Sequence, residues 1–164
     1  MPINTTLLLH VTPLASTTGT LAHALLENIA FTTFLDPSIR STSDTILPTW
    51  FARVFRRAVW TVLALNVTTI VTTATVLHRG GRGHSQTFYW AGLVGAVGHL
   101  CFVPWVMGPV ERIVEGRRES KREGERLGAR PTVDLEAWLR VHWVRMCTVD
   151  LMAWIACVGA VCTL

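Results

Sequence analysis

Charged side chains are scarce in this sequence, and long stretches have none. Asp, Glu, Lys and Arg make up 16% of the 164 residues, well below the roughly 25% that is usual in soluble domains. No such residue occurs from Ala58 to Leu77 or from Gln86 to Val110. About 20 apolar residues are enough to cross a bilayer as a helix. The composition therefore excludes an ordinary soluble domain and predicts an integral membrane protein.

Several familiar signatures are absent as well. The four cysteines stand in apolar runs without a Cys-x-x-Cys pair, so we expect neither a disulfide framework nor a thioredoxin-like redox site. The glycine-rich turn over 78–85 lacks the Walker spacing, which excludes a phosphate loop. No basic segment with a cleavage site opens the sequence, so we expect no cleaved signal peptide. The basic run near residue 120 is interleaved with glutamates, which indicates a solvated loop and no nucleic-acid partner.

What is present fits four helices that cross a membrane. Apolar segments cover about 8–35, 58–77, 88–110 and 138–163, a polar connection covers 36–57, and a charged loop covers 111–136. At this length the chain forms one domain, 1–164. Lys and Arg concentrate in the first and third loops, which places these loops in the cytoplasm and both termini on the lumenal side. The predicted fold is an all-α, four-helix transmembrane bundle in the endoplasmic reticulum or another endomembrane.

Polar side chains inside the predicted spans are the candidate functional residues. Such groups are energetically costly inside a membrane and commonly mark functional sites. The alternative is a purely structural role, in which they hydrogen-bond one helix to another. The candidates are His23, Glu27, Asn66, His99, His142 and Arg145. At a rise of 1.5 Å per residue, the last five lie about 8–17 Å from the cytoplasmic ends of their spans. Because the depths match across four spans, we expect these side chains to line one pocket.

The residue types in this set indicate acid–base chemistry. His23 and Glu27 are one helical turn apart and can contact each other. Glu27, His23 or His99 could act as a base, and Arg145 supplies a fixed cation. Three histidines and a glutamate could also ligate a metal. No two of these histidines have the i, i+4 spacing, however, and we expect no metal site.

Two segments in the second half of the chain carry a recognisable motif. They read GHLCFVPWVMGPVERI (98–113) and LEAWLRVHWVRMCTVDLMAWIACVGA (135–160). His99 precedes an apolar run that ends in a turn with Pro109, and Trp138, His142 and Arg145 stand at the head of the last span. In this pattern the chain resembles the anthrone oxygenase-like family of small four-span membrane proteins.

The resemblance implies a membrane monooxygenase of polyketide secondary metabolism. It would oxidise an anthrone to an anthraquinone, with O2 as co-substrate and no cofactor. The anion of an anthrone can pass an electron to O2, so the protein must supply a base, an oxyanion partner and a dry slot. We expect the catalytic residues to be Glu27, His99, His142 and Arg145, with Glu27 or His99 as the base. We expect His23, Asn66, Trp105 and Trp138 to contact a small aromatic, hydrophobic substrate.

Two other classes of function stay open at this point. One is a membrane isomerase or cyclase that acts on an aromatic or terpenoid intermediate. The other is a non-enzymatic assembly partner or carrier, although a carrier would typically show an internal repeat and the two halves show none. The expected partners are the lipid bilayer and the small hydrophobic substrate, and a homo-oligomer is left open.

Overall fold

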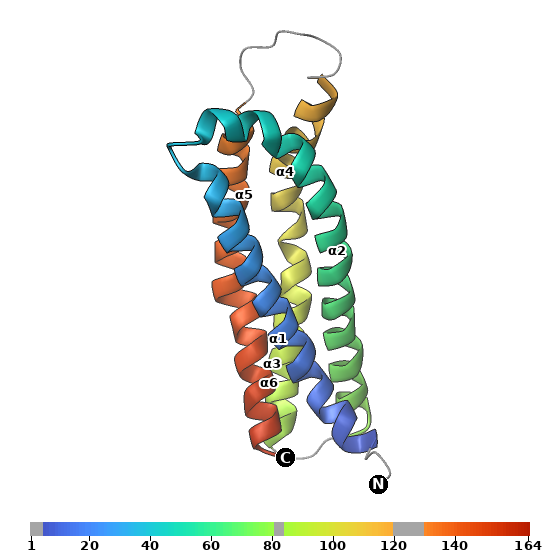
Figure 1. Cartoon of the computed structure of the whole chain (residues 1–164). Coiled ribbons are helices and arrows are strands. Elements are labelled where there is room, and N and C mark those ends of the chain that lie inside the picture. Colours follow the sequence, from blue (N-terminus) through green and yellow to red (C-terminus); the bar gives the residue numbers. More distant parts are fainter. Residues whose placement is uncertain (1–4, 81–83, 120–129) are drawn as a thin grey trace.

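The computed structural model describes residues 5–80, 84–119 and 130–164, and these residues contain helices and no strand. The helices are α1 (Thr5–Thr32), α2 (Arg40–His78), α3 (His84–Cys101), α4 (Val103–Glu119), α5 (Pro131–Arg145) and α6 (Leu151–Cys162). A short 3-10 turn, η1 (Thr33–Leu35), follows α1, and a π-helical turn, η2 (Met146–Asp150), joins α5 to α6. The bundle has four columns, α1, α2, α3–α4 and α5–α6, and the start of α1 and the end of α6 lie at one end of it (Figure 1). The all-α prediction is confirmed.

Three of the columns are long and apolar enough to cross a membrane. They are Arg40–His78, Ser85–Glu115 and Pro131–Cys162. The α1 helix has the length, with 28 residues, but it is the least apolar of the four predicted spans and is not among the three. The structure thus supports three of the four spans by length and composition. The side of the membrane that each end faces stays a prediction.

The start of α2 differs from the polar connection predicted over 36–57. The helix begins at Arg40 and continues for 39 residues, with Pro48 inside it. Its first turns cross the end of the bundle (Figure 1). Leu47 and Phe51 share a helical face, and both are fully buried in a cluster with Phe31 and Trp138. Burial of these apolar residues explains why a polar-looking stretch is helical.

Polar contacts fix the beginning of α5 against α2. The first N–H groups of a helix have no partner within the helix, and here Asp44 of α2 accepts a hydrogen bond from the backbone N–H of Thr132 at 3.0 Å. Arg40 donates to the Thr132 hydroxyl and to the Glu136 carboxylate. These contacts set the entry of α5 into the bundle. The predicted loop over 111–136 is helical at both ends, and its middle, 120–129, lies outside the described residues.

Small residues bring α3 and α6 into close contact. A Cβ on Gly95 would lie 2.8 Å from the Val149 carbonyl oxygen and 2.8 Å from the Ala153 Cβ. A Cβ on Gly98 would lie 3.0 Å from the Val149 side chain. Without side chains at these two positions, the helices can approach each other closely. The same contact brings His99, one turn after Gly95, up to the last column.

We expect Gly95→Ala to destabilise the protein. Alanine usually favours a helix over glycine by about 1 kcal/mol, but here its Cβ overlaps backbone atoms of η2 and α6. Overpacking of this kind typically costs about 1–3 kcal/mol, which thermal unfolding in detergent will show as a lower midpoint. Gly108→Ala is the matched control, because its Cβ meets only the end of the Arg112 side chain, at 3.4 Å. Equal midpoints for the two variants would contradict a required close contact at Gly95.

Candidate functional site

A cavity of about 310 Å³ lies between α2 and the α3–α4 column, with α1 and α5 contributing to its inner wall. Most of its lining is aliphatic or aromatic. The predicted site residues that line it are Glu27, Asn66, His99, Trp138 and Arg145. The structure thus brings five of the eight predicted site residues to one cavity. Their catalytic and binding roles stay predictions.

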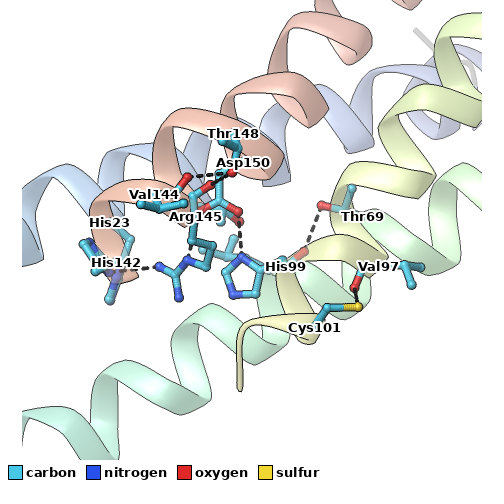
Figure 2. Close-up of polar contacts among 12 residues, drawn as sticks. His23, Thr69, Val97, His99, Cys101, His142, Val144, Arg145, Thr148 and Asp150 are labelled. Carbon is cyan, nitrogen blue, oxygen red and sulfur yellow. Dashed lines mark hydrogen bonds and ion pairs between the residues drawn. The ribbon is translucent and has the colours of Figure 1, made fainter. Parts of the chain in front are cut away.

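His99 is oriented by a buried carboxylate. Its Nδ1 lies 2.7 Å from Oδ1 of Asp150, and both side chains are buried (Figure 2). An ionised carboxylate only accepts hydrogen bonds, so Nδ1 of the neutral imidazole carries the proton and Nε2 is left as an acceptor. Because His99 also lines the cavity, Asp150 holds it in the form that can take a proton from a bound molecule.

Arg145 links this pair to His142. Its Nε donates to Oδ2 of Asp150 at 3.3 Å, and a terminal guanidinium nitrogen donates to His142 Nδ1 at 3.1 Å (Figure 2). The other ring nitrogen of His142 lies 2.9 Å from the Ala24 carbonyl oxygen, to which it donates. His142 also stacks on Trp138, with ring centroids 4.8 Å apart. His142 does not line the cavity itself, but it holds Arg145 in the wall.

Glu27 reaches the same network from α1. Its Oε2 lies 3.6 Å from His23 Nδ1 and 3.9 Å from His142 Nδ1. The predicted contact between His23 and Glu27 is therefore present. His23 lines a separate groove beside the arginines of α2 and not the main cavity. Glu27 is the member of the pair that a molecule in the cavity can touch.

Asn66 keeps a free donor at this site. Its side chain is buried, and Nδ2 has no hydrogen-bond partner within the described parts of the chain. Asn66 borders both the main cavity and a second void of about 10 Å³. That void has room for about one water molecule, and its polar lining also includes Thr17, Thr20, Thr69, His99 and Asp150. Asn66 can therefore donate to a molecule in either space.

The site differs most from the sequence-based prediction at Trp105 and Asp150. Trp105 lies outside the cavity, is 65% exposed and packs edge-on against Phe102. Asp150 is the functional residue that was not predicted from the sequence. In a regular helix it would point about 80° away from His142, but the π-helical turn η2 ends at Asp150, and its wider spacing changes the direction of the side chains. An aspartate inside an apolar span is energetically costly, and this cost was the feature of the sequence that could have identified Asp150 as a site residue.

The fold and the cavity define a class of protein. Membrane-length helices enclose an apolar cavity with a cluster of ionisable side chains at its inner wall, which is typical of an enzyme site for an apolar small molecule. Among the described residues, no three His, Cys, Asp or Glu side chains are grouped to hold a metal ion. The expectation of no metal and no cofactor stays a prediction.

Three fungal proteins that are named epoxidases or probable epoxidases are similar to this chain over nearly its full length. Epoxidase gkaX of Penicillium citrinum is 30% identical over 168 aligned positions, which cover 98% of this chain and 97% of that protein. Probable epoxidase scpX of Mollisia scopiformis is 25% identical, over 93% of each chain. Epoxidase pydX of an Acremonium species is 27% identical, over 93% of this chain and 91% of its own. The chain belongs to this epoxidase family of oxidative enzymes. No family model and no solved structure matches it.

Proposed function

We propose that this chain is a membrane-embedded oxygenase of secondary metabolism that converts a carbon–carbon double bond of an apolar intermediate into an epoxide. The observation that carries the proposal is that His99, which lines an apolar cavity, is hydrogen-bonded to the buried carboxylate of Asp150. The names of the relatives support epoxide formation as the outcome. The cavity supplies the base and the hydrogen-bond donors, and its apolar lining excludes water.

The chemistry starts with a proton transfer. His99 Nε2 removes a proton from a carbon next to a carbonyl group of the substrate, and the Asp150 carboxylate stabilises the imidazolium that forms. Arg145 and Asn66 lie in the same wall and donate hydrogen bonds to the enolate oxygen. Glu27, also in this wall, exchanges the proton needed when a peroxide forms. The substrate is thus prepared as an electron-rich carbanion.

Oxygen transfer then needs only O2 as co-substrate. The carbanion reduces O2, and a carbon–oxygen bond and a protonated peroxide result. The outer peroxide oxygen adds across the double bond as the O–O bond breaks, and the inner oxygen stays as an alcohol. One O2 is consumed and both atoms remain in the product, so electrons balance without a cofactor or an external reductant.

A second candidate is the oxidation of an anthrone to an anthraquinone. The same base and donors suit it, because the anthrone CH2 is acidic and its peroxide loses water to leave the quinone carbonyl. The observation that favours it is the aromatic inner wall, where Trp138 and Phe55 line the cavity and contact each other. The names of the relatives favour epoxidation, and the product distinguishes the two.

Inactivation in the producing organism tests the proposed function. His99→Gln should make an intermediate accumulate that has the double bond and lacks the epoxide. His78→Gln, the same change at an exposed site at the end of α2, should leave the product unchanged. Membrane levels of both variants are measured alongside. Unchanged product from His99→Gln at normal protein level would refute the proposal. If the parent protein forms a quinone and no epoxide, the second candidate is selected.

A further inference from the structure

The cavity has two chemically different sides. Its inner wall carries Glu27, Asn66, His99 and Arg145, which are buried or nearly so. Its outer rim consists of aliphatic side chains that line the cavity and are each more than a third exposed. The rim residues are Val59 (40% exposed), Leu63 (38%), Leu100 (39%), Val103 (43%) and Met107 (50%). The first two belong to α2 and the others to α3 and α4, so the mouth lies between these columns.

The mouth lies on a surface that suits lipid. Both columns beside it are long and apolar enough to cross a membrane. Beyond the rim, Val67 and Val71 of α2 and Val94 and Val97 of α3 are also exposed. Exposed aliphatic side chains on such helices face hydrocarbon, whereas an opening to water would carry polar groups. Glu111, near the polar end of α4, is the one ionisable side chain on the outer part of the lining.

We propose that the cavity opens sideways into the bilayer between α2 and the α3–α4 column, and that the substrate enters by this route. The substrate is an elongated amphiphile. Its hydrogen-bond-accepting end reaches Arg145 and Asn66, and its apolar chain leaves through the rim. The identity of this substrate rests on the proposed function, whereas the sideways opening does not.

The size of the cavity supports an extended substrate. At about 310 Å³ it is at the small end of ligand pockets, which hold roughly 300–1,000 Å³. A larger molecule can place only its reactive end inside. Its remaining apolar part then stays in contact with lipid, which saves the desolvation cost of passing through water. An amphiphile in this pose presents its polar end to the inner wall.

Spin labels at the rim test the opening without any activity assay. Single-cysteine variants are made in a chain whose four cysteines are replaced, with labels at Leu63→Cys or Val103→Cys in phosphatidylcholine nanodiscs. We expect collisions with O2 to exceed those with a water-soluble nickel chelate, as at the control Val71→Cys. Ser38→Cys, on an exposed turn at the end of the bundle, should show the reverse order. Rim labels that behave like Ser38→Cys, or that neither reagent reaches, would overturn the proposal.

Blocking the rim tests whether the substrate uses this route. Leu63→Trp should lower kcat/KM by about tenfold, or ~1.4 kcal/mol, because the indole fills the mouth. Val71→Trp, the same kind of change on α2 but outside the lining, should leave kcat/KM unchanged. Equal values for both variants and the parent would refute the route and leave the oxygenase function intact. A parent protein that makes no oxidised product would instead refute the proposed function, while the spin-label result would still decide the opening.

Discussion

Asp150→Asn will lower turnover per folded molecule by about 10²–10⁴-fold, the usual cost of losing a general base. Asparagine keeps the size of the side chain but can donate its amide N–H to His99 Nδ1. The imidazole then carries its proton on Nε2, the nitrogen that does not contact Asp150, and Nε2 can no longer accept one. Product formation measured by mass spectrometry, divided by the amount of folded protein, gives this turnover.

Two controls separate orientation of His99 from simple loss of fold. Asp134→Asn makes the same chemical change in the ion pair between Asp134 and Arg112. The Arg112 side chain is 59% exposed, and exposed ion pairs contribute little to stability. Its turnover should match the parent. The double variant His99→Gln with Asp150→Asn should be no slower than His99→Gln alone, because residues that act as a unit are not additive. Parental turnover for Asp150→Asn would contradict the assigned role of the carboxylate.

Arg145→Lys is expected to lower turnover by about 10²–10³-fold, the cost of removing one donor to a developing oxyanion. The guanidinium bonds Asp150 and His142 through two different nitrogens and still lines the cavity. A lysine ammonium is a point charge that cannot reproduce this planar arrangement. Arg145→Ala should cost more than His142→Ala, because it leaves negative charge in the cavity without a cation.

Arg140→Lys is the matched control for this prediction. Arg140 lies on the same helix, α5, but its side chain is exposed and outside the cavity. We expect parental turnover from this variant at equal protein level. If Arg145→Lys were as active as Arg140→Lys, the guanidinium would hold helices together and have no part in stabilising the substrate.

Helical regularity explains which parts of the site could be predicted. The rise per residue is constant along a helix, so the matched depths of polar residues in uncharged spans follow from their positions in the sequence. Glu27, Asn66, His99 and Arg145 do line one cavity. The membrane character was predicted from the uncharged runs. Three columns of the structure are long and apolar enough to cross a membrane.

The remainder depends on contacts between distant segments. The early start of α2 follows from burial of Leu47 and Phe51 against residues of other helices, which periodicity within α2 does not show. The π-helical turn that directs Asp150 toward His99 breaks the regular spacing on which the prediction relied. The helix is also interrupted at Phe102, between α3 and α4. The position of Trp105 could therefore not be predicted by extending α3.

Oxygen labelling tests the central claim, that the Asp150–His99 pair starts oxygen transfer inside the cavity. Purified protein in nanodiscs receives the intermediate that accumulates with His99→Gln, under ¹⁸O2 in ordinary water. We predict a product in which both newly added oxygen atoms are ¹⁸O, formed by the parent and by His78→Gln but not by His99→Gln. New oxygen derived from water, or equal labelling with His99→Gln, would contradict this claim.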